Sequence, residues 1–275
     1  MKKQLKIKRL IFQTLRINKI ITMKTRISIL SILLLLSFTV KTFSQDEYIY
    51  HYSILSALND KVYTGNLMIS DLKKHGDLGL GTYNYLNGEM VIVDGTVYKV
   101  LPSGKIVEAD DNELSPYAMI TKFDVDTSLL LKNISSYGEL KKKLSEFLPS
   151  KNIFYALKIK GDFSSIKCGS VNKQEPPFEK RLLETLAERP IFSAKDISGT
   201  LVGLWCPEYI IDINAPGYHL HFVDEHLTIG GHLLEVDIKE VSIEIDIIRG
   251  YRMQLQDSDD FDKVELLLND PEKNY

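Results

Sequence analysis

Short runs in which apolar and polar residues alternate cover most of the chain, and they predict a protein built mainly from β-strands. The run that begins at Tyr48 alternates aromatic residues with other side chains and passes into a short helix that ends near Leu58. Residues 78–108 predict a meander of strands. Its turns are expected at Asn87-Gly88 and Asp94-Gly95, because both dipeptides tolerate the positive φ angles of hairpin turns.

Three further segments have helical rather than strand-like spacing. Residues 70–75 predict a short helix with Ser70 as its N-cap and Gly76 at its end. Residues 137–148 place leucines on one face and lysines on the other, which is typical of a helix packed against a core. Residues 180–189 predict another short helix.

The strand pattern resumes after Pro149-Ser150, which we take as a domain boundary between residues 45–150 and 151–275. The predicted strands of the second part are 154–159, 163–171, 199–205, 241–248 and 251–255, in addition to a hairpin at 217–238. A turn is expected at Gly161-Asp162, between the first two of these strands. Short antiparallel strands joined by glycine turns indicate a barrel or a sandwich, so the fold class is α+β.

Histidines are concentrated in residues 217–232, where four of the six in the chain fall within fourteen positions. His219 and His221 are two residues apart in an expected strand, so their imidazoles point to the same face, about 7 Å apart. Gly230-Gly231 allows a tight path back, and His232 opens the returning strand. Three neutral imidazoles are a ligand set for a divalent metal, with zinc the first candidate. Three protein ligands leave a position open for substrate, which is the catalytic arrangement.

A less specific interpretation also fits this segment. A His-x-His pair in a strand is often two ordinary histidines, and it is the third, His232, that favours the metal site. His226 lies in the polar loop between the two strands, so we expect it to be solvated and to bind no metal.

The first 44 residues carry the features of a secretory signal peptide. They contain ten Lys and Arg and no Asp or Glu, and residues 27–40 form an apolar segment too short for a comfortable membrane span. Thr42-Phe43-Ser44, with small residues at its first and third positions, predicts cleavage before Gln45, and Met23 is an alternative start. We therefore expect a secreted or periplasmic protein without stable membrane insertion, with an uncleaved anchor as the alternative.

Net charge and cysteine content argue against two classes of protein, nucleic-acid-binding proteins and disulfide-rich scaffolds. Without residues 1–44 the chain keeps 24 basic against 37 acidic residues, and this acidic balance argues against nucleic-acid binding. Cys168 and Cys206 are too few for a disulfide scaffold, and the sequence leaves open whether they pair after export.

Several segments between Tyr50 and Phe261 resemble the α-acetolactate decarboxylase family. They are Ser56–Leu58, Lys74–Thr82, Asn87–Glu89, Leu148–Ser150, Asn152–Ala156, Lys173-Gln174, Gly199–Gly203, Pro207–Tyr209, Gly217–Phe222 and Gly230–His232. The resemblance implies a mixed-sheet N-terminal domain with short helices and a C-terminal antiparallel β-barrel that carries the three-histidine metal site. It further implies zinc, frequent dimers, and the decarboxylation of 2-acetolactate to (R)-acetoin and CO₂.

The resemblance also implies roles for two further residues. Glu89 matches the active-site glutamate of the family, so we expect an acid/base role. The alternative is an exposed residue after a turn. Thr82 matches the threonine of the Gly-Leu-Gly-Thr motif and is expected to contact the substrate, a 2-hydroxy-3-oxo acid. The alternative is an ordinary strand threonine.

Two positions depart from the family pattern. The family has an arginine where this chain has Gly169, and Lys167, two residues away, is the expected substitute in substrate binding. The family also brings a glutamate from its C-terminal tail into the site, and Glu272 is the candidate here. Two functions therefore stay open: a zinc-dependent acetolactate decarboxylase, or an exported metal-binding relative with reduced or lost catalysis.

Overall fold

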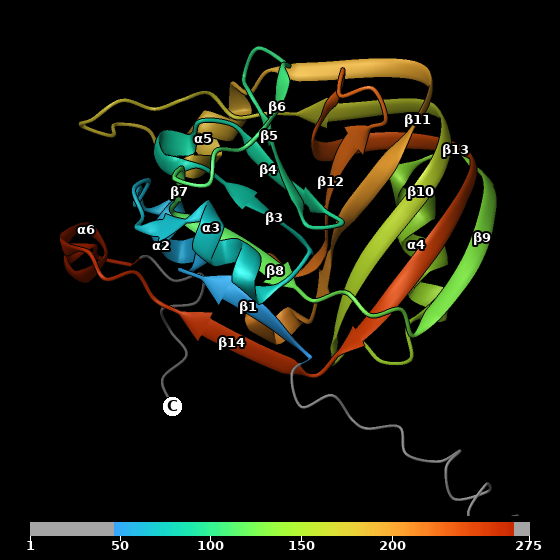
Figure 1. Ribbon diagram of the computed structural model, residues 1–275, viewed down its shortest axis with the longest axis horizontal. Coiled ribbons are helices and arrows are strands. Elements are labelled where there is room, and N and C mark those ends of the chain that lie inside the picture. The colour runs from blue at the N-terminus through green and yellow to red at the C-terminus, as the bar shows by residue number, and fades with distance from the viewer. Residues whose placement is uncertain (1–46, 267–275) are drawn as a thin grey trace, which may run out of the picture. The chain divides into compact units, whose positions relative to one another are not determined.

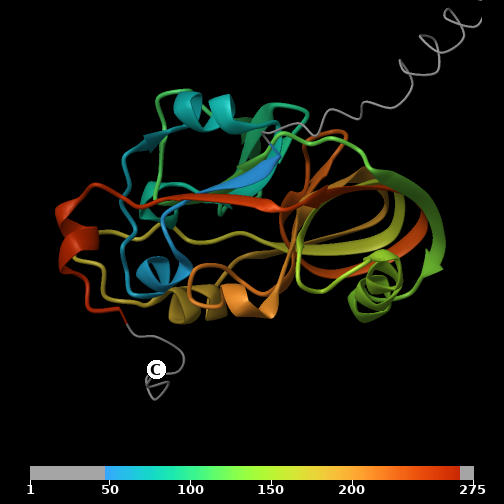
Figure 2. The same ribbon diagram turned by 90° about the horizontal axis from the view of Figure 1, so that it is seen from below.

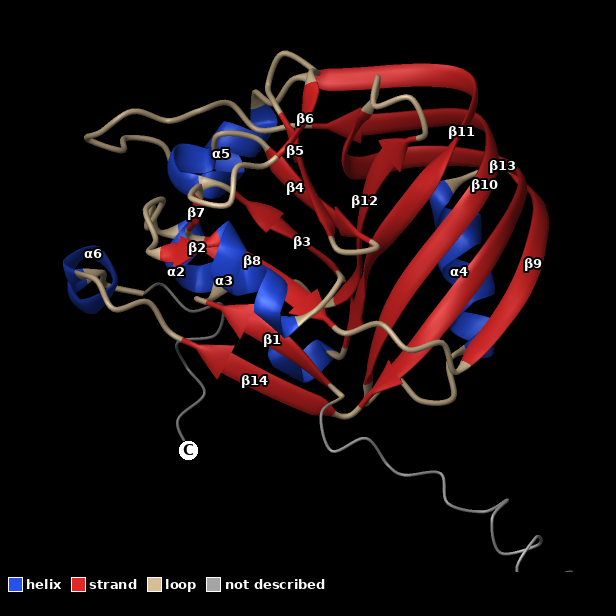
Figure 3. Cartoon of the chain, viewed as in Figure 1, coloured by secondary structure: helices blue, strands red, loops and turns tan. Residues whose placement is uncertain are grey.

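The structure is a computed structural model that describes residues 47–266, so the expected signal peptide and Glu272 lie outside the described residues. Strands dominate the described part and helices are few and short, which confirms the α+β class (Figures 1 and 3). No helix among residues 47–266 is long and apolar enough to cross a membrane. The division into domains at residue 150 stays a prediction.

The first sheet is mixed and has seven strands in the order β14-β1-β8-β3-β4-β5-β6. Its strands are β1 (Tyr48–Tyr52), β3 (Leu78–Thr82), β4 (Glu89–Val93), β5 (Thr96–Val100), β6 (Ile106–Glu108), β8 (Tyr117–Thr121) and β14 (Gly250–Gln254). All neighbours are antiparallel except β14, which pairs in parallel with β1. The last described strand of the chain therefore completes the sheet that the first strand begins. A separate two-stranded sheet joins β2 (Leu67–Met68) to β7 (Leu114–Ser115).

The second sheet is antiparallel throughout. Its strands are β9 (Thr127–Ile134), β10 (Phe154–Gly169), β11 (Ile191–Cys206), β12 (Gly217–Asp224) and β13 (Gly230–Ile248). Strand β10 pairs with both β11 and β13, and β12 also pairs with both, so the pairing runs through four strands and returns to β10. Strand β9 pairs with the distal half of β13.

The described helices are α2 (Leu55–Asn59), α3 (Ile69–Leu72), α4 (Tyr137–Phe147), α5 (Leu182–Ala187) and α6 (Asp259–Lys263), with short 3₁₀ turns beside them. Helix α4 lies against the second sheet and contributes Leu140 and Leu144 to its core (Figure 2). The helix predicted at 70–75 is displaced: Met68 is the residue before α3, and Ser70 lies inside the helix. Gly76 follows with φ 168°, an extended conformation, so it makes no left-handed cap.

The turn expected at Gly161-Asp162 is wrong. Strand β10 continues through both residues, and its register against β13 shifts between Asp162 and Phe163. The pairing steps from Asp162–Glu240 to Phe163–Ile238, so the extra residue of this bulge is Lys239 of β13, whereas Gly161 (φ 154°) and Asp162 stay paired within one long strand. The turns at Asn87-Gly88 and Asp94-Gly95 are confirmed by positive φ at Gly88, Asp94 and Gly95.

Alternation of side chains along each strand builds the cores on the two sides of each sheet. In β10, Phe154 and Ala156 pack with the inner face of the first sheet, and Tyr155 and Leu157 pack with the core beneath α4. Strands β3 and β4 lie against β11, β12 and β13. This contact brings the end of β3 and the start of β4 close to the histidine hairpin.

Asp246 is a buried carboxylate that makes stability depend on pH. It is 1 % exposed in β13, its Oδ2 accepts a hydrogen bond from the Asp124 backbone N–H, and its Oδ1 has no partner among the described residues. Burial raises the pKa of Asp246 from 3.8 to about 7, and the nearby Asp126 carboxylate adds to that rise. The folded protein therefore holds this proton at pH values where the unfolded chain has lost it, so Asp246 makes stability fall between about pH 4 and 7.

Asp246→Asn is expected to raise the melting temperature at pH 8 and to change it little at pH 4, because asparagine resembles the protonated carboxyl. Thermal unfolding of both proteins across this range measures the difference. Glu240→Gln is the matched control, since Glu240 lies on the same strand but is exposed. An equal change in melting temperature for both variants at every pH would contradict the role assigned to Asp246.

Candidate metal centre

The three histidines predicted to bind a metal lie together on the hairpin of β12 and β13. His219 and His221 occupy one face of β12, while Leu220 and Phe222 point into the core of the second sheet. His221 and His232 are direct cross-strand partners, which places their Cβ atoms on the same face. The ring centroids are separated by 5.1 Å (His219–His221), 5.0 Å (His219–His232) and 5.3 Å (His221–His232).

Each ring offers one nitrogen to a common point. The three candidate ligand atoms all lie within 4.8 Å of one another. His221 Nδ1 lies 2.8 Å from the Met90 carbonyl oxygen, which can only accept, so Nδ1 carries the hydrogen and Nε2 keeps its lone pair. His221 Nε2 and His219 Nδ1 are buried and have no hydrogen-bond partner among the described residues. Buried nitrogens without partners are costly unless something binds them, so the geometry fits a metal ion.

The environment keeps the imidazoles neutral. Burial lowers the pKa of His221 to about 3 and that of His232 to about 4, and it lowers the pKa of His219 well below its usual range. The neighbouring histidines add to the effect at His219 and His221, and the Arg189 charge adds to it at His232. Metal binding needs unprotonated rings, so little proton release is required at this site.

Glu89 is buried beside the histidines, at the start of β4, where Gly88 ends the turn. It is 8 % exposed, and its Oε2 lies 3.7 Å from His221 Nε2. Burial raises the pKa of Glu89 to about 8, and the Arg189 charge offsets part of that rise. The alternative of an exposed turn residue does not agree with this burial. A carboxyl that holds its proton near neutral pH has the property that a general acid requires.

The histidines and Glu89 open into one cavity of about 420 Å³ between the two sheets. Thr82 lines this cavity at the end of β3, and its hydroxyl donates a hydrogen bond of 2.8 Å to the Gly88 carbonyl. Most of the remaining wall is apolar and comes from α2, α5 and adjacent segments: Leu55, Leu58, Leu86, Val171, Leu182, Leu183 and Leu186. Such a cavity suits a small molecule with a few polar groups.

Arg189 also lines the cavity, although no sequence motif points to it. It lies two residues after α5 and twenty residues from Gly169 along the chain. Its only sequence signal is a cation before Pro190, which is common at surfaces. The fold brings it to the site because β10 and β11 pair at this end, with Gly169 opposite Ile191.

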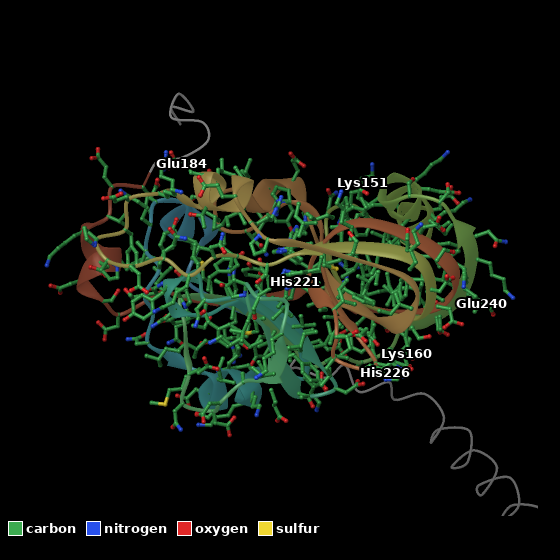
Figure 4. The ribbon with its side chains drawn as sticks, turned by 90° about the horizontal axis from the view of Figure 1, so that it is seen from above. Lys151, Lys160, Glu184, His221, His226 and Glu240 are labelled. Carbon is green, nitrogen blue, oxygen red and sulfur yellow. The ribbon has the colours of Figure 1, made fainter. Side chains whose placement is uncertain are left out.

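Two other expected residues lie elsewhere. Lys167 is half-buried on β10 and forms an ion pair of 3.3 Å with the exposed Glu235, outside the cavity wall. His226 is exposed in the loop between β12 and β13. Figure 4 shows it at the surface, whereas His221 lies in the interior. Cys168 and Cys206 are both free and buried in different core clusters.

Comparison with known proteins gives a consistent assignment. A family model described as Alpha-acetolactate decarboxylase matches residues 49–268. A protein of that name from Methanosarcina mazei is 39 % identical over 220 residues, which cover 80 % of this chain and 76 % of the relative. Its namesake from Brevibacillus brevis is 37 % identical, covering 79 % and 76 %.

Solved structures agree with the sequences. The crystal structure of alpha-acetolactate decarboxylase from Bacillus subtilis strain 168 superposes with a TM-score of 0.79 at 32 % identity. The match covers 81 % of this chain and 95 % of the other. The described fold as a whole is therefore shared with that protein.

Proposed function

Since the chain belongs to the alpha-acetolactate decarboxylase family, a family of carboxy-lyases, we propose that it converts 2-acetolactate to (R)-acetoin and CO₂. The observation that carries the proposal is the convergence of three neutral imidazoles and one buried carboxyl in a single cavity. The metal proposed for the site is zinc, because three histidine nitrogens are a common zinc ligand set in catalytic centres.

The residues present fit such an ion, with His219, His221 and His232 as its ligands. When bound, the metal supplies Lewis-acid stabilisation of the negative charge that develops as CO₂ leaves. The Met90 carbonyl fixes the His221 ring through Nδ1, which keeps Nε2 directed at the shared point. No organic cofactor is required, because the ketone next to the reacting carbon already accepts the electron pair.

Glu89 is the proposed proton donor. Loss of CO₂ leaves an electron pair on the carbon that carried the carboxylate, and this carbon must gain one proton to give acetoin. The Glu89 carboxyl holds a proton near neutral pH and lies on one side of the cavity, next to His221. Delivery from one side produces one enantiomer, so the fixed position of Glu89 accounts for a stereospecific product.

The rest of the cavity wall positions the substrate and limits water. Thr82 uses its hydrogen on the Gly88 carbonyl and therefore presents oxygen lone pairs to a substrate hydroxyl. The leucine-rich wall lowers the local dielectric, which strengthens every charge interaction in the cavity. These features support the substrate contact proposed for Thr82.

Two structural expectations belong to the same proposal. Strand β13 pairs with β10 as well as with β12, which supports a closed antiparallel barrel that carries the metal centre. The homodimer implied by the family resemblance is the proposed assembly, and light scattering during size-exclusion chromatography measures it.

The experiment that tests the function uses purified, zinc-loaded protein and racemic 2-acetolactate. Acetoin formation, its enantiomeric composition and CO₂ release are followed, with a protein-free reaction as the control for spontaneous decarboxylation. Rapid formation of predominantly (R)-acetoin is expected. Zinc binding without acetoin above the control would overturn the proposal and favour an exported metal-binding protein that has lost catalysis.

Export is proposed as well, on the order of basic, apolar and small residues in positions 1–44. Secreted or periplasmic protein is expected to begin near Gln45 when its N-terminus is sequenced. Recovery of the intact N-terminus from a membrane fraction would instead indicate an uncleaved anchor.

A further inference from the structure

Arg189 is the permanent positive charge in the cavity wall. Among the described residues that line the cavity, it is the only arginine or lysine, and the three histidines beside it are held neutral. Arg189 is half-buried, and its guanidinium makes no hydrogen bond or ion pair with any residue between 47 and 266. A guanidinium whose donors have no partner within the described residues is suited to bind a carboxylate in a bidentate manner.

The backbone holds Arg189 in place from both sides. The Asn172 side-chain amide donates a hydrogen bond of 3.1 Å to the Glu188 carbonyl, just before Arg189. The Ser170 backbone N–H donates a bond of 3.0 Å to the Pro190 carbonyl, just after it. Pro190 itself has a restricted φ. The arginine is therefore anchored at its root and free only along its side chain.

Gly169 provides the space through which the arginine enters. A Cβ atom at this position would lie 2.8 Å from Arg189 Cδ and 3.5 Å from its Cγ, so a side chain here would collide with the arginine stem. Gly169 is the cross-strand partner of His232, and directly opposed residues direct their side chains to the same face. The Arg189 stem therefore passes over the face on which His232 points towards the metal centre.

We propose that Arg189 binds the carboxylate of the substrate and that Gly169 is small in order to admit it. The identity of the substrate as a 2-hydroxy-3-oxo acid rests on the proposed function, whereas anion binding by Arg189 does not. The carboxylate departs as neutral CO₂, so the arginine contacts the substrate and has no charge to bind in the product. Arg189 thereby selects carboxylates over neutral ligands of the same shape.

The test compares two unreactive probes, 2-hydroxyisobutyrate and its neutral counterpart 2-methylpropane-1,2-diol, by calorimetric titration of the metal-loaded protein. Arg189→Gln is expected to weaken binding of the carboxylate roughly 10- to 150-fold and to leave the diol within about threefold. Arg189→Lys is expected to lie between wild type and Arg189→Gln, because an ammonium cannot form the bidentate pair. Arg249→Gln, at an exposed arginine outside the cavity wall, is the matched control and should behave as wild type.

Moving the arginine from position 189 to position 169 tests the role of Gly169. Gly169→Arg alone should reduce affinity for the carboxylate, because the new side chain collides with Arg189. The double variant Gly169→Arg/Arg189→Ala should bind the carboxylate at least about tenfold more tightly than Arg189→Ala does. Circular dichroism and metal content establish that each variant is folded and loaded. A folded double variant that binds the carboxylate no more tightly than Arg189→Ala would overturn the part assigned to Gly169, independently of the Arg189→Gln result.

Equal affinity of wild type and Arg189→Gln for 2-hydroxyisobutyrate would overturn the inference. The inference would also fail if Lys167→Gln, and not Arg189→Gln, selectively lost affinity for the carboxylate, since Lys167 would then be the anion-binding residue. Neither probe reacts, so the result is separate from turnover. Wild-type protein that binds the carboxylate through Arg189 but forms no acetoin would refute the proposed function and leave this inference standing.

Discussion

Replacement of His219, His221 or His232 by alanine is expected to reduce metal affinity by at least about 100-fold. The loss of one outer hydrogen-bond partner typically costs 10- to 100-fold, and removal of a direct ligand should cost more. Each imidazole is neutral, the three ligand atoms lie within 4.8 Å of one another, and among residues 47–266 this group contains no fourth histidine to substitute. Metal content after dialysis, measured by mass spectrometry, gives the result directly.

His226→Ala provides the matched control, because His226 comes from the same hairpin but is exposed in its loop. It should retain the metal content of wild type. Equal retention by all four variants would show that the metal lies elsewhere. Loss in His226→Ala alone would move the site to the loop.

The histidine hairpin was predictable because every step depended on local geometry. The two-residue spacing of His219 and His221 fixes their common face, and Gly230-Gly231 sets the returning strand. The structure adds the register, in which His221 opposes His232. It also adds the Met90 carbonyl, which comes from the other sheet and has no signal in the sequence around the histidines.

Long-range pairing accounts for most of what the sequence left undetermined. Strand β14 was expected as a strand, but nothing in residues 250–254 indicates that it pairs in parallel with β1. The Gly161-Asp162 pair is compatible with a turn, and only the continuous partner strands β11 and β13 show that β10 runs through it. Strand patterns specify the elements, whereas the partner of each edge is set by packing of the whole chain.

The cation next to Gly169 could not be identified from neighbouring residues in the sequence. The sequence suggested a missing cation and, as its substitute, the neighbouring Lys167. The structure places Lys167 at the surface beside Glu235 and brings Arg189 into the space above Gly169. Gly169 and Arg189 are twenty positions apart in the chain, so their proximity follows from the pairing of β10 with β11.

Glu89→Gln is expected to lower kcat by about 100-fold or more while the metal stays bound. Glutamine keeps the shape of the carboxyl and is neutral, as the protonated carboxyl is, but it cannot deliver the proton. Since burial raises the pKa of Glu89 to about 8, the wild-type residue holds that proton near neutral pH. Glu89 is outside the three-histidine group, so metal content should not change.

The stereochemistry of the product separates proton delivery from a merely structural role. If Glu89 protonates the substrate from one side, the residual acetoin formed by Glu89→Gln should have a lower enantiomeric excess, because water then reaches either face. Glu108→Gln, at an exposed glutamate of the same sheet, should leave both kcat and enantiomeric excess unchanged. A fall in kcat with full enantiomeric excess would mean that another group delivers the proton and that Glu89 acts on an earlier step. Unchanged turnover in Glu89→Gln would make its burial beside His221 a feature of packing alone.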